Sequence, residues 1–427
     1  MAEIVLHPVS SLSGEPNLPG DKSISHRALM LGALADGDCR IRGLSASQDV
    51  QSTINCLRAL GVEIERNNGD AVVHGIGMYG LKQPAETLDA GNSGTTIRLL
   101  SGILAAQPFT ARITGDESLR SRPMRRIIEP LEKMGAQIDS EDYRAPLTIH
   151  GGKLHAVDYA SPVSSAQVKS CVLLAGLYAQ GTTRITEPHP SRDHTERMLQ
   201  QMGVMVRVNE GIAAVKGPAK LKACDLDVPA DLSAAAFFIV AAIITPNSQI
   251  TLRNVGVNPS RTGILDALTM MGAAVVLDEK QEINFEPRAK IIASSCRLKG
   301  ITLGGAIIPR IIDEIPILAV AATQAEGVTT IRDAAELRVK ESDRLAAIAE
   351  NLKRMGAKVR ELKDGLVITG PTPLKGAEID SFGDHRIAMA FAVAALIAGG
   401  ETRIKNVECV DISFPGFFEQ LRSVTHD

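Results

Sequence analysis

The sequence has few aromatic residues and no excess of basic ones. It contains no tryptophan and only four tyrosines, and no run of aromatic side chains on which bases could stack. Basic residues are not in excess, since 46 lysines and arginines stand against 49 aspartates and glutamates, a formal net charge of −3. This balance favours neither nucleic acid nor an anionic membrane surface as a partner. A site for a negatively charged ligand must therefore be built locally.

The cysteines and histidines lack the spacing of metal-binding motifs. The six cysteines are scattered without a C-x-x-C pair, and no H-x-H or H-E-x-x-H occurs. We therefore expect no metal and reduced thiols in a cytoplasmic protein.

Long apolar runs are also missing. The longest, 234–244 and 387–398, are shorter than the ~20 residues that span a bilayer, so we interpret them as buried helices. Residues 1–5 lack the basic and apolar regions of a signal peptide. These features predict no membrane association.

One short pattern recurs along the 427 residues: a leucine, a glycine four residues later, and a β-branched residue three after that. It predicts a helix that ends at a glycine and is followed directly by a strand. The five copies are Leu57-Gly61-Ile64, Leu131-Gly135-Ile138, Leu199-Gly203-Val206, Leu268-Gly272-Val275 and Leu352-Gly356-Val359.

A second unit alternates with the first: an apolar helix followed by a strand, at 28–35, 97–106, 172–179, 234–244, 315–322 and 387–398. Together the patterns predict an α/β protein of six repeats of roughly 70 residues, the last cut short. Six repeats divide into two lobes of three, 21–229 and 1–20 plus 230–427. The strand at 4–7 would belong to the second lobe.

The stretch 18–29 places Lys22, Ser23 and Arg27 at the start of the first apolar helix. Exposed backbone N–H groups and the helix dipole attract anions there, so a phosphate or carboxylate site is one interpretation. The other is a capped helix with solvated charges. It is not a Walker A loop, because Asp21 stands where that motif has glycine before lysine.

Other helix starts carry polar residues too. Glycines and small polar residues fill 89–96, and Asp313 precedes the fifth apolar helix. Lys340 and Arg344, four residues apart, would share a helical face, as a site or as a solvated ion-pair surface. His194 and His385 we interpret as hydrogen-bonding groups at helix starts. If the lobes face each other, cations from both would suit ligands with several negative charges, with Asp313 and Glu341 as candidate proton carriers.

The sequence resembles the 5-enolpyruvylshikimate-3-phosphate synthase family over essentially its whole length, and its class II bacterial branch most closely. The motifs that carry the resemblance are LPGDKSISHR (18–27), GNSGTTIRL (91–99), SRPMRR (121–126), SSAQVKS (164–170), RDHTE (192–196), RVKESDR (338–344), GDHRIAMA (383–390) and SFP (413–415). The resemblance implies a two-lobed inside-out α/β barrel of six βαβαββ-type repeats, three per lobe, with the active site in the cleft between the lobes.

It also implies the reaction: transfer of the enolpyruvyl group of phosphoenolpyruvate to the 5-hydroxyl of shikimate 3-phosphate, with release of phosphate, through a tetrahedral intermediate. Asp313 would accept the hydroxyl proton, and Glu341 with Lys22 would manage protonation of the methylene carbon. The residues implied to bind shikimate 3-phosphate are Lys22, Ser23, Arg27, Ser164, Ser165, Gln167, Arg192, Asp313 and Lys340. Those implied to bind phosphoenolpyruvate are Lys22, Gly94, Arg122, Gln167, Arg344 and Arg386.

The resemblance further implies a cytoplasmic monomer of the shikimate pathway that needs no metal or organic cofactor. It implies that glyphosate inhibits by occupying the phosphoenolpyruvate site, where Gly94 determines the space available to the ligand.

Four departures weaken the match. Asp21 and His26 differ from the S-K-S-x-S-N-R motif of many members, and a frequent tyrosine is replaced near His194, where Arg192 would take up phosphate binding. Glu336 stands in place of an asparagine, and Ile412 in place of a frequent lysine.

Two alternatives remain. The sister enzyme that transfers enolpyruvyl to UDP-N-acetylglucosamine carries a reactive cysteine in its second repeat, whereas this chain has none between Cys56 and Cys171. A repeat-built nucleic-acid clamp would need a basic inner face, which the net charge of −3 does not favour.

Overall fold

The computed structural model describes residues 2–67 and 69–426. The chain divides into two compact units. The N-terminal unit comprises Gly20–Val228 and Glu282–Glu286, and the C-terminal unit comprises Met1–Pro19, Pro229–Gln281 and Pro287–Asp427. The chain therefore passes between units at 19/20 and 228/229, and twice more around the five residues 282–286, which the sequence pattern did not indicate.

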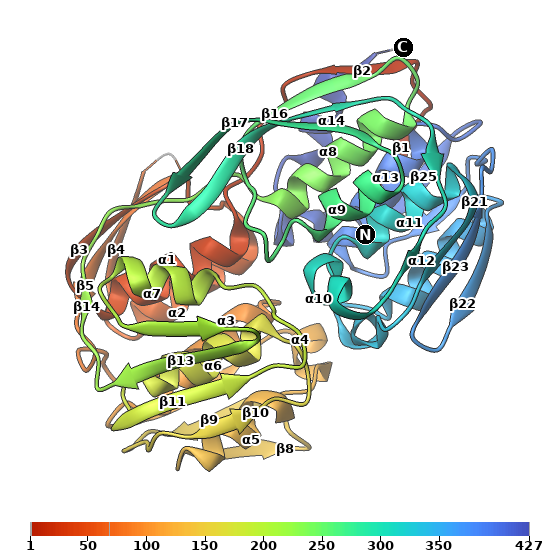
Figure 1. The fold of residues 1–427 in the computed structure, drawn as a ribbon. Helices are drawn as coiled ribbons and strands as arrows, with labels where there is room; N and C mark the ends of the chain where they lie inside the picture. Colours follow the sequence, from red (N-terminus) through yellow and green to blue (C-terminus); the bar gives the residue numbers. More distant parts are fainter. Residues whose placement is uncertain (1, 68, 427) are drawn as a thin grey trace. The chain divides into compact units, whose positions relative to one another are not determined.

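Three sheets of one topology form the N-terminal unit (Figure 1). In each, a short strand runs parallel to the first long strand, and the remaining two strands are antiparallel. The strands are β3 (Ala35–Arg42), β4 (Glu63–Asn67), β5 (Asp70–Ile76), β14 (Leu221–Lys222) and β15 (Leu226–Asp227); β6 (Leu88–Asp89), β7 (Thr110–Thr114), β8 (Gln137–Glu141) and β9 (Arg144–His150); and β10 (Asp158–Ala160), β11 (Gly181–Thr186), β12 (Val206–Asn209) and β13 (Ile212–Gly217).

The C-terminal unit repeats this topology twice, with its last sheet completed by the start of the chain. There β1 (Glu3–Leu6) pairs antiparallel with β25 (Thr402–Lys405), as expected for a strand at 4–7 that belongs to this unit. The other strands are β2 (Ser11–Gly14), β16 (Gln249–Gly256), β17 (Ala274–Ile283), β18 (Glu286–Ser294) and β26 (Thr425–His426); β19 (Leu298–Lys299), β20 (Thr302–Leu303), β21 (Ala325–Ile331), β22 (Lys358–Leu362) and β23 (Gly365–Gly370); and β24 (Glu378–Asp380).

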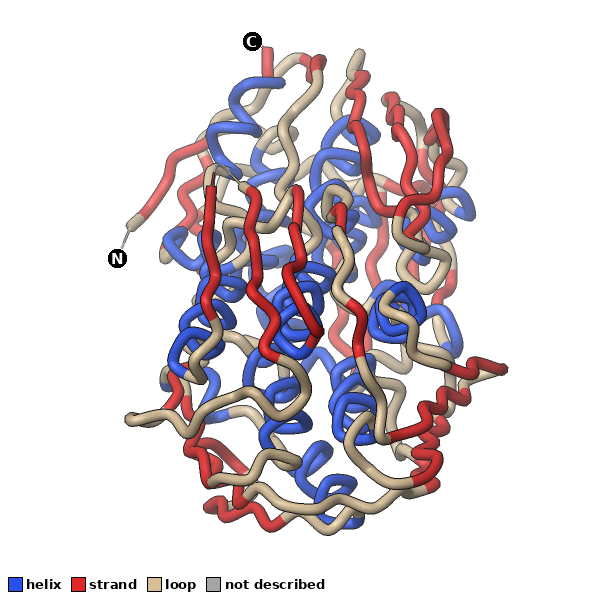
Figure 2. The backbone as a smooth tube through the Cα atoms, turned by 90° about the vertical axis from the view of Figure 1, so that its left-hand side faces the viewer, coloured by secondary structure: helices blue, strands red, loops and turns tan. Residues whose placement is uncertain are grey.

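Apolar helices form the centre of each unit, and the sheets lie outside them (Figure 2). In the C-terminal unit α8 (Leu232–Ile244), α11 (Ile315–Thr323) and α13 (His385–Ala395) contact one another. In the N-terminal unit α3 (Gly94–Leu104) contacts both α1 (Lys22–Leu34) and α6 (Ala166–Gly176). These helices are apolar nearly all round because they are covered on every side. The six predicted apolar helices are thereby confirmed, and the fold is the two-lobed inside-out α/β barrel.

Amphipathic helices complete the repeats, and the glycine signal marks their ends. All five glycines of the repeated pattern have positive φ, from +83° at Gly356 to +96° at Gly135, a conformation that glycine adopts without strain. The remaining helices are α2 (Gln48–Ala59), α4 (Glu117–Ser121), α5 (Arg125–Lys133), α7 (His194–Gln201), α9 (Gly263–Met270), α10 (Ile308–Ile311), α12 (Arg344–Arg354) and α14 (Phe417–Val424), with 3₁₀ turns η1 (Gly305–Ile307), η2 (Ala335–Val339) and η3 (Val407–Ile412).

Candidate active site

In the N-terminal unit, α1 begins at the predicted anion-binding stretch. Asp21 is its N-cap and accepts a hydrogen bond from Ile24 N. Lys22 Nζ lies 2.7 Å from Asp49 Oδ2 on α2, so the lysine is paired with a carboxylate. Ser23 occupies the first turn, where backbone N–H groups have no partner within the helix.

Arg27 is buried and held in one orientation. Its guanidinium donates to Thr195 Oγ1 at 2.7 Å, Ser170 Oγ at 2.7 Å and the Ser23 carbonyl at 2.9 Å. Burial lowers the pKa of Arg27 to about 10, which leaves it charged at neutral pH. Three elements, α1, α6 and α7, thus fix one cation.

Gly94 is the first residue of α3, and Ser93 is its N-cap. A Cβ built on Gly94 would lie 2.7 Å from Arg98 Nη1 and 3.5 Å from Arg122 Nη1, so two guanidinium groups approach this backbone. Arg122 is buried and donates to the side chain of Asn92 at 2.7 Å. The helix start at Gly94 therefore has the N–H groups and cations that an anion requires.

Gln167, on the first turn of α6, joins this helix start to α3. Its Oε1 accepts from Arg98 Nη1 at 2.6 Å, and its Nε2 donates to Thr95 Oγ1 at 3.0 Å. Ser165 is the N-cap of α6, and Ser164 Oγ accepts from His189 N at 2.9 Å. The structure thus links Gly94, Arg122 and Gln167 by contacts around the starts of α3 and α6.

A buried chain of hydrogen bonds connects α1, α2 and α3. His26 Nδ1 lies 2.6 Å from Thr53 Oγ1, Thr53 Oγ1 lies 2.7 Å from Thr96 Oγ1, and Thr96 Oγ1 donates to Ser93 Oγ at 2.7 Å. Burial, together with the charges of Lys22 and Arg27, lowers the pKa of His26 well below its usual value. A neutral histidine therefore fixes the start of α1 relative to that of α3.

The segment before α7 contains Arg192, whose charge helps to lower the pKa of Arg27 and which therefore lies near it. His194 begins α7, and its Nδ1 lies 2.6 Å from Glu286 Oε1 at the tip of the β17–β18 hairpin. The expectation that His194 is a hydrogen-bonding group at a helix start is confirmed. Its partner was not foreseen, since it comes 92 residues later in the chain.

In the C-terminal unit, Arg344 is surrounded by carboxylates. It begins α12, is 1% exposed, and lies 2.7 Å from Asp384 Oδ2, 2.6 Å from Glu341 Oε2 and 3.4 Å from Asp313 Oδ1. Burial alone would lower the pKa of Arg344, but these carboxylates raise it above its usual value. The structure thus brings Asp313, Glu341 and Arg344 together.

Arg386 joins the same cluster from the first turn of α13. Its Nη1 donates to the Asp313 carbonyl at 2.9 Å, and its Nη2 lies 3.9 Å from Asp313 Oδ2. Asp313, between α10 and α11, therefore faces two arginines, which stabilise its carboxylate form.

Lys340 and Arg344 do not share a helical face, so that prediction is wrong. Lys340 has an extended backbone after η2, and α12 begins only at Arg344 with Asp343 as its N-cap. Arg338 favours this arrangement because it donates to Asp343 and to the Leu362 carbonyl. Lys340 Nζ lies 3.7 Å from Glu336 Oε1.

Several charged and amide side chains of these clusters were not predicted from the sequence. Asp49, Asn92 and Asp384 hold Lys22, Arg122 and Arg344, and buried Arg98 contacts Gln167. One sequence signal was present for Arg98: a lone cation in an apolar helix, one turn after Gly94. Ile412, where the family often has lysine, packs against the hydrophobic core and supplies no charge.

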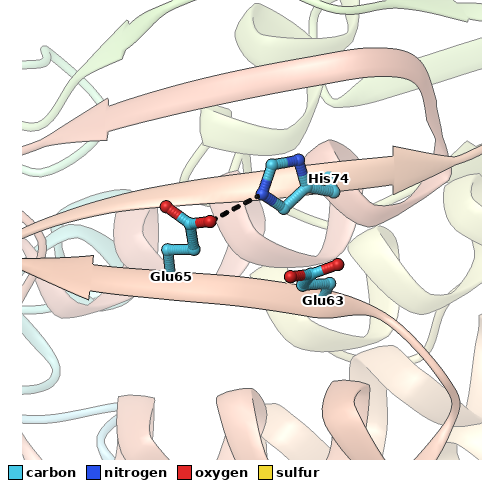
Figure 3. Close-up of side chains that lie close together, drawn as sticks. All are labelled: Glu63, Glu65 and His74. Carbon is cyan, nitrogen blue, oxygen red and sulfur yellow. Dashed lines mark ion pairs between the residues drawn. The ribbon is translucent and has the colours of Figure 1, made fainter.

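One group of side chains among the described residues has donors close enough to hold a metal ion: Glu63, Glu65 and His74 (Figure 3). They lie on neighbouring strands β4 and β5, and both glutamates are exposed. His74 Nδ1 also lies 2.9 Å from Asp38 Oδ1, and this hydrogen bond raises its pKa. Solvated ion pairing accounts for this arrangement.

The cysteines are free thiols, and burial raises the pKa of Cys56, Cys171 and Cys409 to about 12. These three are therefore poor nucleophiles at neutral pH. Within the described ranges, no helix combines the length and apolar character needed to cross a membrane.

Comparison with known proteins shows which family the chain matches. Residues 6–421 match the family described as EPSP synthase (3-phosphoshikimate 1-carboxyvinyltransferase). Proteins named 3-phosphoshikimate 1-carboxyvinyltransferase from Brevibacillus brevis and Bacillus thuringiensis are 53% and 51% identical to the chain. The alignments cover 97% and 100% of this chain and 98% and 100% of theirs. A solved structure of EPSP synthase from Acinetobacter baumannii superposes with a TM-score of 0.88 at 44% identity, covering 99% of this chain and 98% of that one.

Proposed function

The chain belongs to the EPSP synthase (3-phosphoshikimate 1-carboxyvinyltransferase) family, and from that membership we propose how its residues divide the work of the reaction. The enzyme transfers the enolpyruvyl group of phosphoenolpyruvate to the 5-hydroxyl of shikimate 3-phosphate and releases phosphate, a step of the shikimate pathway. The observation that supports the division most is the cluster of Asp313, Glu341, Arg344 and Arg386, which combines carboxylates and cations.

The residues that we propose to bind shikimate 3-phosphate are Lys22, Ser23, Arg27, Ser164, Ser165, Gln167, Arg192, Asp313 and Lys340. The support is that Arg27 is oriented by Thr195 and Ser170 and is charged, as a phosphate ligand must be.

Most of the residues that we propose to bind phosphoenolpyruvate lie in the first turn of a helix. They are Lys22, Gly94, Arg122, Gln167, Arg344 and Arg386. Together the two substrates carry roughly five negative charges at neutral pH, which repel unless cations intervene.

The chemistry then follows in two steps. Asp313 accepts the 5-hydroxyl proton while the hydroxyl oxygen bonds to C2 of phosphoenolpyruvate, and the Lys22 ammonium group together with Glu341 delivers a proton to C3. The tetrahedral intermediate then returns a C3 proton to these two groups as the C2–O bond to phosphate breaks. Cations fixed before the reaction stabilise the charge on the departing phosphate.

Phosphate release, measured with phosphoenolpyruvate in the presence and absence of shikimate 3-phosphate, tests the proposal. We expect release only with both substrates, and an unchanged rate with a chelator. UDP-N-acetylglucosamine in place of shikimate 3-phosphate should give no release; release with it would favour the sister activity.

Asp313→Asn tests the assigned base. We expect shikimate 3-phosphate to bind with similar affinity and kcat to fall by roughly 10²- to 10⁴-fold, because the amide cannot accept the proton. Asp278→Asn, which alters an exposed ion pair with Lys290, is the control and should leave kcat unchanged. A kcat for Asp313→Asn near that of the wild type would show that another group is the base.

We also infer a cytoplasmic enzyme that acts without nucleic acid, membrane or cofactor. The support is the set of free cysteines and the use of amino-acid side chains for every assigned role.

A further inference from the structure

A second buried charge cluster lies in the N-terminal unit, and none of the roles above uses it. Lys169 of α6 is 5% exposed, and its Nζ lies 2.8 Å from Glu196 Oε1 and 3.2 Å from Glu187 Oε2. The two carboxylates are 2% and 1% exposed. Buried charges persist only when they are paired, so this lysine joins α6, α7 and the segment after β11.

Glu187 also accepts hydrogen bonds from two separate stretches of backbone. Its Oε1 accepts from Ser165 N at 2.8 Å, which fixes the N-cap residue of α6. Oε1 also accepts from Ser191 Oγ at 2.8 Å, and Oε2 accepts from Ser191 N at 3.3 Å. Lys169 Nζ itself donates to the Ser191 carbonyl at 3.1 Å. These hydrogen bonds fix Ser165 and Ser191, and Ser191 directly precedes Arg192.

Glu196 and Lys169 are each adjacent in the chain to a residue that contacts Arg27. Thr195, the residue before Glu196, and Ser170, the residue after Lys169, lie 2.7 Å apart through their hydroxyl oxygens. Both hydroxyls accept hydrogen bonds from Arg27. The pair Lys169–Glu196 therefore holds α6 and α7 together directly beside the two hydroxyls that orient Arg27.

We propose that Lys169 is a positioning residue for shikimate 3-phosphate, which acts through Glu187 and Glu196 on Ser165, Arg192 and Arg27. It touches neither substrate. The inference rests on the proposed function, because these three residues are the ones assigned there to this substrate. Burial alone would lower the pKa of Lys169, but the two glutamates raise it, so it stays charged at neutral pH.

The test compares Lys169→Met with Lys169→Arg by steady-state phosphate release. For Lys169→Met we expect KM for shikimate 3-phosphate to rise roughly tenfold or more, since small misplacements of binding groups are costly. KM for phosphoenolpyruvate, at saturating shikimate 3-phosphate, should change less than about threefold. Lys169→Arg should recover part of the loss. Arg184→Met on β11, which breaks the half-exposed ion pair with Asp158 on β10, is the control and should resemble the wild type.

If Lys169→Met does not fold, the double variant Lys169→Met/Glu196→Gln is measured in its place. It has one unpaired buried carboxylate charge fewer than Lys169→Met. A folded variant whose KM for shikimate 3-phosphate lies within twofold of the wild type would overturn the inference, as would equal losses for both substrates. The wild-type requirement for shikimate 3-phosphate is measured in the same assay. Its absence would refute the proposed function, whereas a failed KM split with that requirement intact would refute only the role of Lys169.

Discussion

At the residue scale, the cations assigned to the substrates already have partners. Lys22 is paired with Asp49, Arg122 with Asn92, and Arg344 with Asp384. An incoming anion must therefore share or replace these hydrogen bonds. Such exchange favours ligands whose oxygens match the existing geometry, and it disfavours those that bring charge alone.

Gly94→Ala separates a steric from a backbone role for this glycine. A glycine can also be required for a positive φ, but Gly94 lies outside the left-handed region, so this backbone role does not apply and alanine suits the backbone. Its methyl group would lie against Arg98 and Arg122. We expect glyphosate to compete with phosphoenolpyruvate in the wild type, and its inhibition constant to rise in Gly94→Ala at least about tenfold more than KM for phosphoenolpyruvate.

Inhibition and Michaelis constants measured on both forms decide this prediction. Gly152→Ala is the control, because a Cβ there meets nothing within 4 Å. Equal losses for inhibitor and substrate in Gly94→Ala would argue against discrimination by the methyl group.

His26 predicts an acid-sensitive stability. Because burial lowers its pKa in the folded state, below about pH 6.5 the unfolded chain binds a proton that the folded chain does not. In that range the free energy of unfolding therefore decreases as the pH is lowered. Between pH 7.5 and 5.5 we expect the wild type to lose about 1 kcal/mol more of its unfolding free energy than His26→Gln does.

Urea unfolding at both pH values measures this difference. His74→Gln is the matched control with the opposite sign, because the hydrogen bond with Asp38 raises the pKa of His74 in the folded state. His74 thus contributes stability below its unfolded pKa that disappears as pH rises. Equal pH slopes for the wild type and His26→Gln would contradict the assignment.

At the element scale, local signals predicted most of the repeats. The glycines after α2, α5, α7, α9 and α12 mark helix ends, and each is followed by a strand, because both the positive φ and the β-branched residue act within a few positions. The segment before α12 was mispredicted because Arg338 binds carbonyls of β22 and its turn, more than 20 residues away.

The candidate site could be predicted only in part for the same reason. Motifs identified Arg27, Gly94 and Arg344, but the groups that orient them come from other repeats. Thr195, for example, is 168 residues from Arg27, and Asp384 is 40 residues from Arg344. Such pairings depend on packing, which spacing along the chain does not encode.

The tip of the β17–β18 hairpin is the element most amenable to a test. Asn284 has φ +54°, accepts from Asp227 N at 2.9 Å and donates to the Asp225 carbonyl at 3.1 Å. Asn284→Gly keeps the backbone freedom but loses both bonds, and should cost about 1 kcal/mol of unfolding free energy. Asn284→Ala should cost about 1 kcal/mol more, since alanine disfavours positive φ.

Denaturant titrations of both variants give these differences. Asn247→Gly is the control, because Asn247 has the same backbone conformation, φ +53°, on an exposed turn. Equal stability of Asn284→Gly and the wild type would mean that the two hydrogen bonds contribute nothing.

At the scale of the whole molecule, each unit has its own hydrophobic core. Exposed large apolar side chains, such as Tyr79, Met205 and Val328, lie on separate segments. We therefore expect a monomer, and light scattering after gel filtration at micromolar concentration should give 45.4 kDa. A mass of twice that value, independent of dilution, would contradict this expectation.

The first strands of the chain pair with its last. β1 pairs with β25, and β2 pairs with β26 at residues 425–426, so two sheets of the C-terminal unit need both ends of the chain. During synthesis β1 and β2 are made hundreds of residues before β25 and β26, with which they pair. The segment 20–228 meets most of its partners long before that and can fold first. A chain interrupted before β25 is made therefore leaves β1 and β2 without these partners, and such open strand edges favour aggregation.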